Sequence, residues 1–145
     1  MINKVRITLT GLVVTFVIIQ FFDPAPVNPI TNATTFMLTY RPASVEVTNL
    51  LKNSCFDCHS YETDYAWYAY VAPVSWYIDN HVSESREHVN FSKWTSYTPE
   101  EHEHILGECH EEIEQLHMPL KSYQLLHSDA RLSEEERELL LGYFK

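Results

Sequence analysis

Two cysteines that lie two residues apart, with a histidine directly after them, form the segment Cys55-Phe56-Asp57-Cys58-His59. This spacing is typical of covalent haem attachment, in which each thiol adds to one vinyl group and forms a thioether bond. The histidine then lies beneath the iron and can bind it through an imidazole nitrogen. The motif therefore predicts two covalent anchors, Cys55 and Cys58, and one axial iron ligand, His59.

The same pair of cysteines could serve other chemistry. A dithiol redox centre of the thioredoxin kind would need a βαβ context, and no Val- or Ile-rich strand precedes Cys55. A zinc site needs two further ligands, which Cys109 and His110 could supply. Cys109 also falls on the apolar face of a predicted helix, where a free cysteine is commonly a small buried hydrophobe. We favour haem and keep a zinc-stabilised interaction module as an alternative.

The second axial position of the iron has one favoured candidate. Met118 lies just past the end of a predicted helix, and Pro119 would stiffen the loop that carries it. A histidine–methionine pair raises the reduction potential and suits electron transfer. His117 is the adjacent competitor, and His110 and His127 are weaker ones. If the distal site is open or Met118 dissociates readily, a haem peroxidase or gas sensor is the alternative function.

Helical periodicity runs from Ser44 to the end of the chain and predicts the elements that position these residues. Ser44 can cap a short helix that leads to the motif. A second helix begins near Pro73, and a third begins at Pro99, where Thr98 opens a capping box. Ser133 opens a last short helix in the same way. No segment alternates as a strand does, so the prediction is a small all-α, cytochrome c-like domain around a covalent haem.

Aromatic side chains are dense in the segment after the motif. They are Tyr61, Tyr65, Trp67, Tyr68, Tyr70, Trp76 and Tyr77. Aromatic rings pack well on a flat macrocycle, and their polar ends can reach water or propionates. We therefore expect this segment to line the haem, and Arg86 and His88 could meet the haem propionates.

The N-terminus predicts export from the cytoplasm. Lys4 and Arg6 precede an apolar run over residues 7–22, which as a helix would measure roughly 24 Å, slightly less than a hydrocarbon core of about 30 Å. No A-x-A cleavage signal follows, so we favour an uncleaved, single-pass anchor over a cleaved signal peptide. Residues 23–145 would then lie on the periplasmic side of the bacterial inner membrane. After cleavage, the domain would instead be secreted to the periplasm.

The rest of the chain divides into a linker and one domain. Residues 23–43 contain four prolines and read as an extended linker that holds the domain off the membrane, and residues 44–145 form the haem domain. Residues 1–22 carry two basic side chains and no acids, so the remainder has 8 basic against 20 acidic side chains. This balance argues against nucleic-acid binding through phosphate contacts. It is compatible with a basic redox partner, whose identity the sequence does not give.

The chain resembles the bacterial haem-binding domain family, whose members carry a single CxxCH motif and a membrane anchor or signal. The resemblance covers roughly residues 29–143. It is carried by residues 54–60, Trp67-Tyr68, Ala72-Pro73-Val74-Ser75-Trp76, Arg86, residues 90–94, Met118-Pro119, Tyr123, His127 and residues 130–133. It implies one covalent haem c attached at Cys55 and Cys58, with His59 as axial ligand, and it fits Met118 as the distal ligand. We therefore expect a membrane-tethered electron carrier rather than an enzyme.

Overall fold

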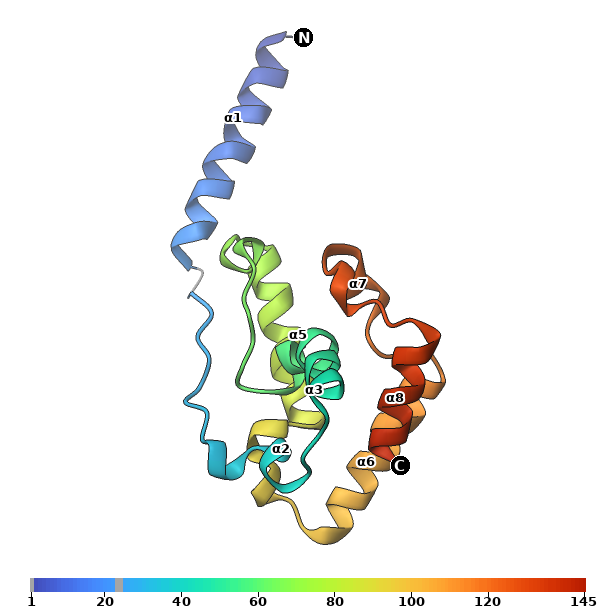
Figure 1. Cartoon of the computed structure of the whole chain (residues 1–145). Helices are drawn as coiled ribbons and strands as arrows, with labels where there is room; N and C mark the ends of the chain where they lie inside the picture. The colour runs from blue at the N-terminus through green and yellow to red at the C-terminus, as the bar shows by residue number, and fades with distance from the viewer. Residues whose placement is uncertain (1, 23–24) are drawn as a thin grey trace.

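The computed structural model of the protein describes residues 2–22 and 25–145. Within these residues every regular element is helical, so the all-α prediction is confirmed (Figure 1). The longer helices are α1 (Ile2–Ile19), α3 (Val45–Leu51), α5 (Val74–His88), α6 (Pro99–Glu114) and α8 (Glu134–Phe144). The shorter ones are α2 (Met37–Tyr40), α4 (Asp57–His59) and α7 (Lys121–Leu126), with the 3-10 turns η1 (Gln20–Phe22), η2 (Ala33–Thr35), η4 (Trp67–Tyr70), η5 (Phe91–Ser96) and η6 (Ser128–Ala130) and the π-helical turn η3 (Lys52–Phe56).

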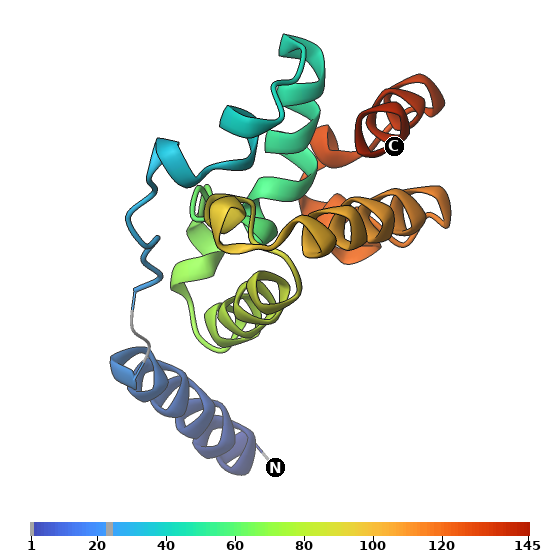
Figure 2. The ribbon, with the colours of Figure 1, turned by 90° about the horizontal axis from the view of Figure 1, so that it is seen from below.

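Helix α1 stands outside the domain, as both ribbon views show (Figures 1 and 2). Its apolar span, Asn3–Phe22, has 20 residues with a mean hydropathy of 2.0, and none of it is buried against the rest of the protein. Such a helix measures about 30 Å, which matches the hydrocarbon core of a bilayer. Length and composition therefore make it a candidate membrane span or signal.

The core of the domain lies where α3, η3, α6 and α8 meet. α8 packs against both α6 and α3. Leu51, Phe56 and Leu140 are almost completely buried there, and the Phe56 ring meets Phe36 edge-on at 5.2 Å between centroids. Met37 is also fully buried. The core therefore begins before residue 44, within the segment for which the sequence predicts a linker.

The helix starts follow from local sequence signals. Thr98 and Ser133 both form the predicted capping boxes, at the starts of α6 and α8. Ser44 caps α3 by accepting a hydrogen bond from the Val47 backbone N–H. Each cap satisfies backbone N–H groups that would otherwise lack a partner at a helix N-terminus. Helices α3, α6 and α8 therefore begin at residues that can be identified from the sequence alone.

Candidate haem site

The motif lies on one helical run that continues from the capped helix α3. α3 leads through the π-helical turn η3 into α4, which ends at His59. Cys55 lies in η3, whereas Cys58 and His59 lie in α4. A π-turn inserts an extra residue into a helix and is frequent at functional sites. Cys55 therefore lies in a π-helical turn and Cys58 in the α-helical turn that follows it.

His59 is held by the end of helix α5. Its Nδ1 atom lies 3.2 Å from the Ser85 carbonyl oxygen and 3.2 Å from the Val89 carbonyl oxygen. A carbonyl can only accept, so Nδ1 carries the proton and the Nε2 lone pair stays free. Burial lowers the pKa of His59, which favours the neutral ring. This is the state in which a histidine binds iron, with its other nitrogen oriented by a backbone carbonyl.

Two adjoining cavities flank the motif. The larger measures about 610 Å³ and is lined by Cys55, His59 and Met118, together with residues of α5 and α6. The smaller measures about 200 Å³ and is lined by Cys58. His81, Ser85 and Leu120 line both. Residues 63 positions apart along the chain, Cys55 and Met118, thus share one cavity between α5 and α6.

The three cysteines are free thiols in apolar surroundings. Burial raises the pKa of Cys58 to about 11, with a smaller contribution from Asp57. Burial, followed by the nearby carboxylates of Glu108 and Glu112, raises the pKa of Cys109 to about 12. Burial also raises the pKa of Cys55, and Cys109 adds to that effect across the cavity. All three thiols are therefore protonated at neutral pH.

Helix α6 ends in a turn that carries Met118. Leu116 adopts a left-handed backbone with φ of 61°. The N–H groups of His117 and Met118 each donate to the Glu112 carbonyl at 3.0 Å, and the Leu116 N–H donates to the Ile113 carbonyl at 3.2 Å. The bonds of Leu116 and His117 are those of a Schellman motif, in which glycine usually takes the left-handed position. The turn directs the chain from α6 back across the cavity.

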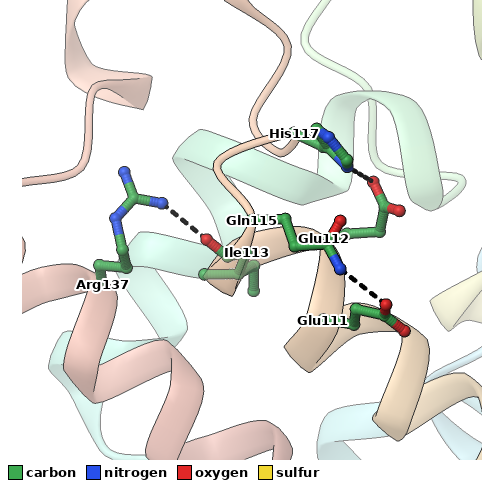
Figure 3. A network of polar contacts seen from close by, with 6 residues as sticks. All are labelled: Glu111, Glu112, Ile113, Gln115, His117 and Arg137. Carbon is green, nitrogen blue, oxygen red and sulfur yellow. Dashed lines mark hydrogen bonds and ion pairs between the residues drawn. The ribbon is translucent and has the colours of Figure 1, made fainter.

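This turn separates Met118 from its competitor. The His117 side chain is 59% exposed, and its Nδ1 lies 3.4 Å from the Glu112 carboxylate (Figure 3). His117 and His110 line neither of the two cavities, whereas Met118 lines the larger one. Of these two cavities, His127 lines only the smaller, and its Nε2 lies 2.5 Å from the Tyr68 hydroxyl. Of the four candidates for the distal position, only Met118 shares a cavity with His59.

A comparison with known protein families matches residues 14–145 to the haem-binding domain. The chain belongs to the haem-binding domain family. Searches of curated proteins and of solved structures found no match. The family match covers nearly the whole chain and assigns haem as its ligand. The resemblance drawn from the sequence is thereby confirmed.

The residues around the larger cavity fit a haem group. Its volume falls within the range of about 300–1,000 Å³ that is usual for cofactor sites. It offers a thiol at Cys55, an imidazole nitrogen at His59 and a thioether at Met118, and the second thiol, Cys58, lines the adjoining cavity. These are the donor types that haem proteins use for attachment and axial ligation. The chemistry of the cavity thus agrees with the family.

The zinc alternative finds no support in the geometry. Among residues 2–22 and 25–145, no three His, Cys, Asp or Glu side chains gather closely enough to hold a metal ion. Cys55, Cys58 and Cys109 line the two adjoining cavities, but His110 lines neither of them. The four residues that the zinc hypothesis needs are therefore not brought together.

Arg86 has a different role from the one that the sequence suggested. Its guanidinium donates to the Ser60 carbonyl at 2.8 Å and to the side-chain oxygens of Asn28 and Thr63 at 3.0 Å each. It also lies 5.2 Å from the centre of the Tyr61 ring. Arg86 thus ties the loop after the motif to α5 and to the N-terminal segment. His88, in contrast, lines the larger cavity.

Contacts of Asp57 were not foreseeable from the sequence. Tyr123 donates its hydroxyl to the Asp57 carboxylate at 2.6 Å, and the Asp64 N–H donates to the same carboxylate at 2.8 Å. The Tyr123 ring also stacks on His127 at 4.0 Å between centroids. Nothing in the spacing of these residues signals the contacts, because 66 positions separate Tyr123 from Asp57. Together they fasten α7 to Asp57, one of the two residues between the motif cysteines.

Proposed function

We propose that the protein is a membrane-tethered monohaem c-type cytochrome that carries electrons on the periplasmic side of the bacterial inner membrane. The observation that carries this proposal is the shared cavity of Cys55, His59 and Met118, with His59 Nε2 free to bind iron. When bound, haem supplies an iron that changes its oxidation state by one electron.

Each residue of the site has a separate task in this proposal. Cys55 and Cys58 would hold the group by thioether bonds, so that it would stay bound in both oxidation states. The Ser85 and Val89 carbonyls hold His59 in the orientation and tautomer that an axial ligand needs. Met118 would hold the iron through its thioether and would exclude water and substrates from it. These roles describe an electron carrier rather than an enzyme.

The membrane anchor and its orientation belong to the same proposal. Lys4 and Arg6 lie at the N-terminal end of the apolar span, and positive charges at one end of a span favour the cytoplasmic side. Residues 1–22 would form an uncleaved anchor, 23–43 the connection and 44–145 the haem domain on the other side. A basic redox partner remains compatible with the acidic charge of residues 23–145.

Covalent attachment can be tested on the full-length chain, expressed in a bacterium with c-type haem maturation. We expect haem to stay with the polypeptide on a denaturing gel, detected by its peroxidase stain. A Cys55→Ala/Cys58→Ala variant should lose this band, because both thioether bonds are gone. Cys109→Ala, a third thiol at the same cavity, should keep it. Haem that leaves the wild-type chain on denaturation would contradict covalent attachment.

The absorption spectrum of the same protein distinguishes the electron carrier from the open-site alternative. We expect sharp low-spin bands in the reduced state and a weak long-wavelength methionine-to-iron band in the oxidised state. A high-spin spectrum would instead favour a peroxidase or gas sensor with an open distal site. Protein that holds no haem despite competent maturation would overturn the cytochrome proposal.

A further inference from the structure

Six exposed aromatic and leucine side chains lie at one end of the domain. They lie in η4, at the start of α5 and in α7. They are Trp67, Tyr70, Trp76, Tyr77, Leu125 and Leu126, and we call them the aromatic edge. Trp67 is 78% exposed and Leu125 is 76% exposed. The expectation that this aromatic segment lines the haem is therefore wrong for Trp67, Tyr70 and Trp76, which line neither cavity beside the motif.

The members of the aromatic edge lie together although α7 is distant from η4 and α5 in the sequence. Tyr77 and Leu126 line the same small cavity. Figure 1 shows the green segment before α5 and the red helix α7 at one end of the domain, and α1 runs away from the domain on that side. Residues 65–78, which supply four of the six side chains, contain no charged residue. This is unusual in a domain that is otherwise strongly acidic.

One direct contact fixes this end of the domain to the apolar span. Gln20 donates its side-chain N–H to the Ala72 carbonyl at 3.1 Å and accepts the Ala72 N–H at 3.0 Å. Gln20 is two residues before Phe22, where the apolar span ends. At 1.5 Å per residue, the contact lies only about 3 Å from the end of the span. Ala72 is thus held at the depth where the span leaves the hydrocarbon.

The aromatic edge is therefore close to that depth as well. Tyr70 is two residues from Ala72, and even an extended chain covers only about 7 Å in that distance. Trp and Tyr are enriched at the membrane–water interface, because each ring pairs an apolar body with a polar tip. Exposed leucines gain by entering the same layer. A surface of this composition, at this height, suits lipid headgroups and the first part of their acyl chains.

We propose that the aromatic edge lies in the headgroup layer of the bilayer that α1 spans, so that the domain rests on the membrane. This inference builds on the proposed anchor and goes beyond it, because a tether alone would leave the domain free in solution. It also replaces the expectation that the linker holds the domain off the membrane. The small cavity beside Cys58, lined by Tyr77 and Leu126, then faces the lipid.

The chain contains a matched pair of reporters for this proposal. Tyr77 on the aromatic edge is 57% exposed, and Tyr40 in α2 is 58% exposed. The test places the full-length haem protein in phosphatidylcholine nanodiscs and measures hydroxyl-radical oxidation of each tyrosine by mass spectrometry. We expect Tyr77 to react several-fold more slowly than Tyr40, because lipid shields it. Equal reactivity of the two rings would overturn the proposal.

A variant and its control separate lipid contact from other protection. Trp67→Glu/Leu125→Glu places two charges in the headgroup layer, which should lift the edge and bring Tyr77 reactivity close to that of Tyr40. Both side chains are exposed, so the fold should tolerate the change. Val45→Glu/Ile30→Glu alters two residues that are 80% and 94% exposed outside the edge and should leave Tyr77 protected. Continued protection of Tyr77 in the Trp67→Glu/Leu125→Glu variant would contradict lipid contact.

Failure of the anchor can be told apart from failure of the docking. Flotation of phosphatidylcholine vesicles with the full-length chain reports whether α1 anchors it at all. A chain that stays at the bottom of the gradient contradicts the anchor and, with it, the docking. A chain that floats but shows equal Tyr77 and Tyr40 reactivity keeps the anchor and overturns the docking alone.

Discussion

At the scale of single residues, the site depends on which atoms of the motif remain available. His59 is partly buried and its Nδ1 atom is engaged by two carbonyls, so only Nε2 can reach a metal. Met118 shares the cavity, whereas the neighbouring His117 pairs with Glu112 at the surface. One peptide unit thus separates a cavity residue from a solvent-exposed one, and the backbone turn after α6 makes the difference.

The proposed axial role of Met118 leads to a prediction with a built-in control. Met118→Ala should convert a low-spin spectrum to a high-spin one and allow added imidazole or azide to bind, because the distal position opens. His117→Ala should leave the spectrum unchanged. Absorption spectra of the two purified variants, with and without added ligand, check this. The reverse pattern would assign the distal position to His117.

Leu116 gives a prediction on stability. Its left-handed backbone, with φ of 61°, costs a residue with a Cβ about 1–2 kcal/mol relative to glycine. Leu116 is 54% exposed, so little burial is lost on its removal. Leu116→Gly should therefore raise the free energy of unfolding by about 1 kcal/mol. Leu125→Gly, within α7, should lower it by about 1 kcal/mol. Urea unfolding of both variants tests the opposite signs, and a loss of stability in Leu116→Gly would contradict the strain.

At the scale of elements, caps and turns place the helices that build the cavity. α6 and α8 begin at capping boxes, and α6 ends in a Schellman motif. Each of these features sets where a helix begins or ends, and so which residues reach the cavity. A cap that shifted by one residue would turn the apolar face of α6 by about 100°.

The capping box of α8 predicts a pH dependence. Hydrogen bonds from the Ser133 backbone N–H, and then from its hydroxyl, lower the pKa of Glu136. A carboxylate with a lowered folded-state pKa adds stability above its unfolded-state value of 4.5, and this contribution is lost as pH falls through the folded-state pKa. Ser133→Ala removes the hydroxyl bond, so the loss of stability below pH 4.5 should become less steep. Thermal unfolding across this pH range measures it. An unchanged slope would show that the hydroxyl does not matter.

At the scale of the whole molecule, Arg86 joins segments that are far apart in the sequence. Its guanidinium holds Asn28, Ser60 and Thr63, and so links the N-terminal segment, the loop after the motif and α5. Charge-assisted hydrogen bonds of this kind are shorter and stronger than neutral ones. The segment before residue 44 is thus fastened to the domain near the haem motif as well as through the core.

Loss of this connection should be measurable. Arg86→Ala should lower the free energy of unfolding by about 2 kcal/mol, because it leaves the Ser60 carbonyl without its partner. Arg86→Lys should recover only part of this, since an ammonium cannot reproduce the fork geometry of a guanidinium. Arg131→Ala removes an exposed side-chain hydrogen bond to the Gln124 carbonyl and serves as the control. Urea unfolding compares all three, and equal stability of Arg86→Ala and Arg131→Ala would contradict the linking role.

The sequence alone determined the features that depend on near neighbours. The CxxCH motif, the caps at Thr98 and Ser133, the helical character of residues 2–22 and 25–145, and the apolar span of α1 all follow from residues a few positions apart. Such features depend on backbone and side-chain chemistry within one or two helical turns. For this reason they could be predicted without any knowledge of how the helices pack.

Only the tertiary structure decided which distant residues meet. It placed Met118 rather than His117 in the cavity of His59, turned Arg86 toward the loop after the motif, and left Trp67 exposed. Composition could not separate an aromatic that packs on a cofactor from one that faces outward, because the same ring suits either place. The direction of each side chain depends on how α5, α6 and α7 pack, and that packing is a property of the whole chain.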